Sequence, residues 1–139
     1  ETGTDRQKAW DLLNSVRTRA EATSITEANY DEMMSIRKKT HNLTFIDDST
    51  PEGKFRTALY WERGFELAFE GQRKYDLIRW GVLGKALKLF GEISSVNQKE
   101  NKPYPAYRNF TEGKHELFPI PLKEIQSNPK LNGMNNNGY

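Results

Sequence analysis

The amino-acid sequence predicts a mainly α-helical fold, and three observations support this prediction. Apolar side chains recur at spacings of three and four residues in several segments, as they do along one face of a helix. Helix start signals precede these segments at Thr4, Ser24 and Thr50. After Gly91 the helical period is lost, and prolines and turn residues become frequent. The 139 residues have the length of one domain.

The first helix is expected over residues 5–20. Thr4 and Gln7 have the spacing of a capping box. The expected apolar face consists of Ala9, Leu13, Val16 and Ala20, with Trp10 widening it.

A weaker second helix is expected over residues 27–39, with Ser24 and Glu27 as its capping pair. Its last residues are basic, which suits the negative end of the helix dipole. Residues 40–49 break the pattern and are expected to form a loop.

Thr50 and Pro51 predict the start of a third helix, because they place a capping hydroxyl before a proline at the first helical position. This helix is expected to continue to Glu70, with an interruption at Gly71, and a further helix is expected to end near Phe90.

The C-terminal part is expected to be largely irregular. Residues 91–116 have no sustained period and predict a long surface loop with turns. Pro119 and Pro121 then require an extended segment. Leu117, Phe118 and Ile120 are expected to anchor it on the helices, and one helical turn is expected over residues 122–126.

The third helix carries three glutamates at every fourth position, Glu62, Glu66 and Glu70. When residues are placed at about 100° intervals, Glu62 falls in the middle of the apolar arc and Glu66 falls inside it. A buried, unpaired carboxylate costs several kcal/mol or stays protonated. Cationic partners are therefore expected.

Arginine suits this role because its planar fork binds a carboxylate through two hydrogen bonds. Arg73 and Arg79 are expected to fold back on the glutamates or to pair with Asp76. The structural ion-pair network expected here comprises Glu62, Arg63, Glu66, Glu70, Arg73, Asp76 and Arg79.

The residues do not favour catalysis, and we predict no catalytic residue, cofactor or metal. Cysteine is absent. His41 and His115 are remote from the glutamates, so the Glu-x-x-His pairing of helical metal sites is missing. A hydrolytic carboxylate pair needs an open cleft, whereas these glutamates face the expected core. There is no GxSxG, HExxH or phosphate-cradling glycine loop.

Composition narrows the possible partners further. A net charge of +2, with aromatic residues scattered away from basic runs, gives no nucleic-acid footprint. The hydrophobic content of 35% and mean hydropathy of −0.86 are low for a self-sufficient globule. One interpretation is a folded piece whose core is partly completed elsewhere. The chain starts without methionine, which suggests a fragment, and it has no apolar run of transmembrane length, so we expect it to be soluble.

Three stretches of the sequence are together distinctive: LLNSVRTRA at residues 12–20, ERGFELAFEGQRKYDLIRWG at residues 62–81, and LFPIPLKEIQSNPKLNGMNNNGY at residues 117–139. They resemble, in the same order, the C-terminal part of the SusD/RagB family. The resemblance implies the C-terminal region, over residues 1–139, of a helical fold with a tetratricopeptide-like N-terminal scaffold that this chain lacks.

The resemblance also implies a function. SusD-like proteins are lipid-anchored lipoproteins on the outer membrane, at the cell surface, where they bind glycans or in some members peptides. They have no catalytic activity and act as a lid over a SusC-like TonB-dependent transporter. The implied partners are therefore the transporter, a glycan ligand and the N-terminal part of the same protein, without nucleic acid. The alternative is a helical scaffold that binds a protein and touches no sugar.

Glycan contacts usually come from aromatic rings that stack on sugar faces and from polar groups that bind hydroxyls. The candidates for such contacts are Tyr104, Tyr107 and Phe110 in the loop 97–114, and Asp47 and Asp48 together with Phe45. The alternative for the aromatic residues is that they pack the loop onto the helices. Asp47 and Asp48 lack the alternate spacing of a calcium loop.

Overall fold

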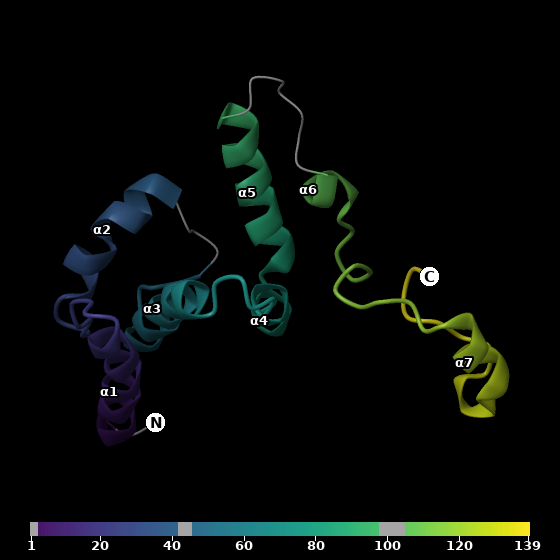
Figure 1. Ribbon diagram of the computed structural model, residues 1–139, viewed down its shortest axis with the longest axis horizontal. Coiled ribbons are helices and arrows are strands. Elements are labelled where there is room, and N and C mark those ends of the chain that lie inside the picture. The colour runs from purple at the N-terminus through teal and green to yellow at the C-terminus, as the bar shows by residue number, and fades with distance from the viewer. Residues whose placement is uncertain (1–2, 42–45, 98–104) are drawn as a thin grey trace. The chain divides into compact units, whose positions relative to one another are not determined.

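The computed structural model describes residues 3–41, 46–97 and 105–139 (Figure 1). Within these ranges the chain forms seven α-helices, one short 3-10 helix and no strand. The prediction of a mainly α-helical fold is confirmed. The chain divides into two compact units, Glu1–Lys74 and Tyr75–Tyr139. In the described part of the chain, no helix has the length and apolar character needed to cross a bilayer.

The first unit contains α1 (Gly3–Arg19), α2 (Tyr30–His41) and α3 (Pro51–Glu66). Helices α1 and α3 pack directly against each other (Figure 1). The core of this unit consists of Trp10, Leu13, Ile25, Tyr30, Met34 and Ala58.

Helix α1 ends in a Schellman motif. Glu21 adopts the left-handed conformation, with φ of 55°. The amide of Glu21 donates to the carbonyl of Thr18 at 3.0 Å, and the amide of Ala22 donates to that of Arg17 at 2.9 Å. The predicted Thr4 and Gln7 capping box is wrong, because Thr4 lies within α1 and the side-chain Nε2 of Gln7 donates to Asp11 Oδ1. The turn directs the chain back so that Ile25 enters the core.

A reciprocal cap precedes α2, but not at the expected residues. The backbone amide of Thr26 donates to Asn29 Oδ1 at 2.7 Å, and the amide of Asn29 donates to Thr26 Oγ1 at 3.3 Å. The predicted capping pair of Ser24 and Glu27 is therefore wrong. Asparagine supplies the same acceptor as the glutamate of a capping box, with a shorter side chain.

The start of α3 agrees with its sequence signal. Thr50 has extended backbone angles, and its hydroxyl accepts from the amide of Gly53 at 3.0 Å, with Pro51 at the first helical position. Gly53 is buried against the preceding loop, and a Cβ built there would lie 1.9 Å from the carbonyl oxygen of Asp47. The loop therefore crosses the helix at a point that only glycine permits.

Helix α3 ends four residues before the predicted end at Glu70. Its last turn tightens, because the amide of Ala68 donates to the carbonyl of Phe65, only three residues back. Phe69 then has a positive φ of 68° and is fully exposed. The prediction that Phe69 belongs to the apolar face of the helix is wrong, because the chain is no longer helical there.

Helix α4 (Arg73–Arg79) leads into the second unit, which also contains α5 (Leu83–Asn97), α6 (Pro105–Asn109), α7 (Leu122–Ser127) and the 3-10 helix η1 (Pro129–Leu131). The expected single helix up to Phe90 is wrong, because it is divided at Gly81. This glycine has φ of 66° at the centre of a second Schellman motif. Helical structure at α6 also corrects the prediction of a continuous loop.

Two glycines of α5 let aromatic residues approach the helix closely. A Cβ at Gly84 would lie 2.8 Å from a ring carbon of Phe110, and a Cβ at Gly91 would lie 2.6 Å from a ring carbon of Tyr107. Both rings therefore pack against the backbone of α5, to which α6 is also packed (Figure 1).

Asparagine side chains hold the extended segment around Pro119. Asn135 accepts from the amide of Ile120 at 2.7 Å and donates to its carbonyl at 3.3 Å. Asn136 donates to the carbonyl of Phe118 at 2.6 Å. Leu117 and Phe118 are exposed, so the expectation that they anchor the segment is wrong. The prolines lack amide donors, and the C-terminal asparagines bond the groups that remain.

We predict that Gly53→Ala destabilises the protein by about 1–3 kcal/mol, because a backbone carbonyl blocks the new methyl group. The matched control is Gly64→Ala on the same helix, where the nearest atom is the movable guanidinium carbon of Arg73, at 3.3 Å. Chemical denaturation of both variants should show a loss for the first only. Equal unfolding free energies would contradict the proposed close contact.

Candidate functional site

The acidic face of α3 meets α1 at a buried ion pair. Arg17 Nη1 lies 2.5 Å from Glu62 Oε2, and the two side chains are 7% and 11% exposed. Glu62 is therefore inside the first unit, where the helical angles placed it. Its described partner is Arg17, which is not among the arginines predicted to pair with the glutamates.

Arg17 also ties down the turn after α1. Its Nε donates to the carbonyl of Thr23 at 2.8 Å. One turn earlier, Asn14 donates to the carbonyl of Ile25 and accepts from its amide, both at 2.8 Å. Two side chains of the LLNSVRTRA stretch thus bind the returning chain, and one of them also binds α3.

A second pair lies at the outer end of the same contact. Arg19 pairs with Glu66, and the two side chains are 68% and 34% exposed. Solvent screens such a pair, and its contribution to stability is small. The inner pair is therefore the one on which the packing of the two helices depends.

The remaining residues of the expected network are dispersed. Arg79 pairs with Asp76, which is one of the two arrangements expected for it. Arg73 donates to the carbonyl of Tyr60 at 2.8 Å, and its guanidinium lies 3.9 Å from the centre of the Tyr60 ring. Glu70 is exposed beyond the end of α3.

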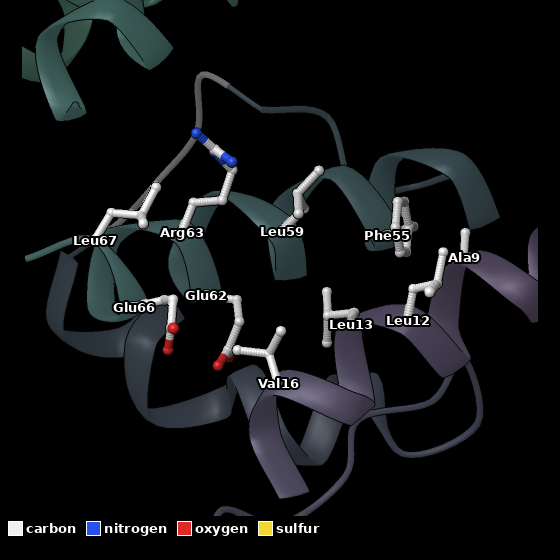
Figure 2. Close-up of a pocket in the computed structure, with 10 residues that line it drawn as sticks. All are labelled: Ala9, Leu12, Leu13, Val16, Phe55, Leu59, Glu62, Arg63, Glu66 and Leu67. Atoms are coloured by element: carbon white, nitrogen blue, oxygen red, sulfur yellow. The ribbon is translucent and has the colours of Figure 1, made fainter. Parts of the chain in front are cut away.

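An open groove of about 330 Å³ runs beside the ion pairs, between α1 and α3 (Figure 2). Figure 2 shows Phe55 and Leu12 toward one end and Glu62 and Glu66 toward the other. Most of the lining is aliphatic. The lining residues are Ala9, Leu12, Leu13, Val16, Phe55, Leu59, Glu62, Arg63, Glu66 and Leu67.

The candidate glycan residues do not form one cluster in the described structure. Tyr104 and Phe45 lie outside the described residues. Tyr107 and Phe110 are partly buried against α5. Asp47 and Asp48 lie in the loop before α3, where Asp47 Oδ1 accepts from the amide of Ser49 at 2.9 Å.

Asp48 holds the buried end of Tyr30. The Tyr30 hydroxyl donates to Asp48 Oδ2 at 2.8 Å, and Tyr30 is completely buried. Burial raises the pKa of the Tyr30 phenol above its usual 10.0; the hydrogen bond to Asp48 adds to this increase, and Thr57 opposes it. Hydrogen bonds from Ser49 lower the pKa of the exposed Asp47 carboxyl.

The carboxylates of this arrangement take part in ion pairs within the first unit. Glu62 and Glu66 both engage arginines, so neither is poised as a lone acid or base. In the described part of the chain, no three acidic or histidine side chains gather in a group that could hold a metal. The class defined by these features is a helical protein with an internal ion-pair clamp and an apolar groove.

Comparison of the sequence with known protein families shows the family to which it belongs. The SusD family matches the chain over residues 1–139, and the chain belongs to this family. Two of the stretches that carry the resemblance contain Arg17 and Glu62, which are the partners of the buried ion pair.

Two relatives come from Formosa agariphila. SusD-like protein P25 is 40% identical over 87 residues, which are 61% of this chain and 15% of that protein. SusD-like protein P2 is 34% identical over 94 residues, which are 68% of this chain and 16% of that protein. The chain thus spans a small part of the length of these relatives. No solved structure matches it.

We predict that Arg17→Ala lowers the free energy of unfolding by about 3–5 kcal/mol, because it leaves Glu62 buried without its cation. Arg19→Ala is the matched control on the same helix, and it should cost no more than about 1 kcal/mol, since its pair is exposed. Denaturant titration of both variants measures the difference. Similar losses would contradict the distinction between the inner and outer pairs.

We also predict that the free energy of unfolding depends on pH through Tyr30. Because the pKa of Tyr30 is raised in the folded state, the folded protein keeps the phenol proton to a higher pH than the unfolded chain does. The stability that this difference contributes is complete below pH 10. It is lost as the pH rises from 10 toward the folded pKa, by up to about 1.4 kcal/mol per pH unit. Tyr30→Phe removes the proton, so its unfolding free energy should fall less steeply above pH 10. Parallel curves for the two proteins would contradict this assignment.

Proposed function

We propose that this chain serves non-catalytic capture of glycans at the bacterial cell surface and their delivery to a SusC-like TonB-dependent transporter. The observation that carries the proposal is the match to the SusD family over residues 1–139. Glycan binding for uptake is the activity that this family suggests. The protein is proposed to be a lipid-anchored outer-membrane protein in its intact form.

The absence of a catalytic role is part of the same proposal. Hydrolysis of a glycoside requires a proton donor and a second carboxylate on either side of the bond. Glu62, which faces the interior of the first unit, and Glu66 at its outer edge are each paired with an arginine instead. Measurement of reducing-sugar release across a panel of polysaccharides tests this part, and release by the purified protein would overturn it.

Tyr107 is a candidate for glycan contact, and the geometry suggests how to separate that role from packing. One part of its ring lies against Gly91, while the side chain as a whole is only partly buried. Phe110 has the same relation to Gly84. Tyr104, Asp47 and Asp48 remain proposed contacts on the strength of their residue types alone.

We predict that the intact protein is retarded in native gels containing its polysaccharide, and that Tyr104→Ala with Tyr107→Ala weakens this retardation. Tyr107→Phe is the control, because it keeps the ring that packs on Gly91. A double variant that migrates like the parent protein would refute a sugar contact at these residues. Lack of retardation by any polysaccharide of a broad panel would refute glycan capture itself.

A second candidate function is a helical scaffold that binds a peptide or protein without touching sugar. The apolar groove between α1 and α3 is the observation that favours it. Such a scaffold would show no retardation in polysaccharide gels, and its binding would not depend on Tyr107.

A further inference from the structure

The second unit contains two Asn-Gly pairs, Asn132-Gly133 and Asn137-Gly138, and both are exposed. Such pairs can rearrange without an enzyme, because a glycine nitrogen meets no hindrance from a side chain of its own when it attacks Cγ of the preceding asparagine. The nitrogen bonds to Cγ, the Cγ–Nδ2 bond breaks, and the departing nitrogen takes up the proton of the glycine amide and leaves as ammonia. Water then opens the succinimide ring at one of its two carbonyls, which gives aspartate or isoaspartate.

The backbone conformation of each pair decides how readily this ring closes. The glycine nitrogen reaches Cγ only when it is eclipsed with Cβ of the asparagine. This geometry corresponds to a ψ of about −120° at the asparagine, which is the value that the first central residue of a type II′ turn adopts. A turn that can reach this type without moving its flanking residues therefore favours the reaction.

Asn132 is one peptide rotation away from the required geometry. Its φ is 48° and its ψ is 38°, and Gly133 has φ of 72°. The amide of Met134 donates to the carbonyl of Leu131 at 2.8 Å, so these four residues form a type I′ turn. Rotation of the single peptide between the two central residues gives a type II′ turn, because both types have a positive φ at the first of them. The closing hydrogen bond stays in place.

The surroundings of Gly133 leave room for this rotation. A Cβ built on Gly133 would meet no atom within 4 Å. Among the described residues, the side chain of Asn132 has no hydrogen-bond partner, so it can turn toward the glycine nitrogen.

The turn at Asn137 is of another type. It is closed by the amide of Tyr139, which donates to the carbonyl of Asn136 at 3.1 Å. Gly138 has φ of 81°, whereas the φ of Asn137 is not positive, and this is the pattern of a type II turn. Rotation of its central peptide leads to a type I turn, with ψ of about −30° at the first central residue. The ring-closing geometry is therefore not reached by the same simple rotation.

Neighbouring groups also restrain the second pair. The side chain of Asn137 donates to the carbonyl of Gly113 at 3.4 Å. A Cβ built on Gly138 would lie 2.9 Å from Cδ of Lys114, so the lysine side chain covers this glycine. Ring closure at Asn137 must break the first contact and displace the second group.

We propose that Asn132 is a site of spontaneous deamidation in the folded protein, and that the fold protects Asn137 although it also precedes a glycine. The reaction replaces a neutral amide by a carboxylate, and isoaspartate also adds one carbon to the main chain. This carbon enters shortly before Asn135, whose side chain binds the amide and the carbonyl of Ile120. The modification is therefore expected to loosen the extended segment around Pro119. This inference does not depend on glycan capture.

The first test compares the two asparagines within one molecule. The intact protein is incubated in mildly alkaline buffer, and peptide mapping by mass spectrometry follows aspartate and isoaspartate at each position. We expect Asn132 to react at least about tenfold faster than Asn137, which is the ratio for a barrier difference the size of one hydrogen bond. In denaturant the two rates should converge, because both pairs are then unfolded. Equal rates in the folded protein, a faster Asn137, or no reaction at Asn132 would each overturn the proposal.

Two variants test the structural reasons. Lys114→Ala removes the side chain that covers Gly138, so it should accelerate the reaction at Asn137 and leave the rate at Asn132 unchanged. Asn132→Gln is the matched control, because its longer amide would have to close a less favourable ring. It should abolish the reaction at its own position and leave Asn137 as slow as in the parent protein. An unchanged rate at Asn137 in Lys114→Ala would contradict protection by the lysine.

Hydrogen exchange tests the structural consequence. The amide of Ile120 donates to Asn135 Oδ1 at 2.7 Å in the unmodified protein, which should slow its exchange with solvent. We expect this amide to exchange faster in the isoaspartate form, separated from the parent protein by ion-exchange chromatography. Identical exchange in the two forms would refute the loosening of the extended segment.

Discussion

The buried ion pair between Arg17 and Glu62 is the constraint on which the first unit depends. Two charges withdrawn from water repay their desolvation only when geometry and further hydrogen bonds satisfy both. Arg17 achieves this by binding Glu62 and the carbonyl of Thr23 together. The pair therefore sets the register of α1 against α3 and also fixes the turn that leads Ile25 into the core.

The same contact determines which apolar surface remains open. Once Trp10 and Leu13 face the core, the neighbouring side of α1 must face away from it, and with α3 it forms the groove that contains Leu12.

Much of the local structure was predictable because its causes are local. Thr50 and Pro51 start α3 as predicted, and the 3.6-residue period placed Glu62 inside the unit. The same period applied to α1 puts Arg17 on the face of Trp10 and Leu13, and this signal could have identified the partner. The aromatic candidates differ, since the packing of Tyr107 on Gly91 depends on where α6 meets α5. The ends of α3 and α4 were missed because backbone turns with positive φ, at Phe69 and Gly81, follow them.

By itself, the sequence determined the helical class, the family resemblance and the need for a cation beside Glu62, since periodicity, motifs and the cost of a buried charge act over short stretches. Only the tertiary structure decided that the cation is Arg17, 45 residues away along the chain. It also decided that Asp48 binds the buried Tyr30 hydroxyl, and that α1 and α3 leave an apolar groove. The physical reason is that these contacts join distant segments, whose meeting depends on the packing of whole helices.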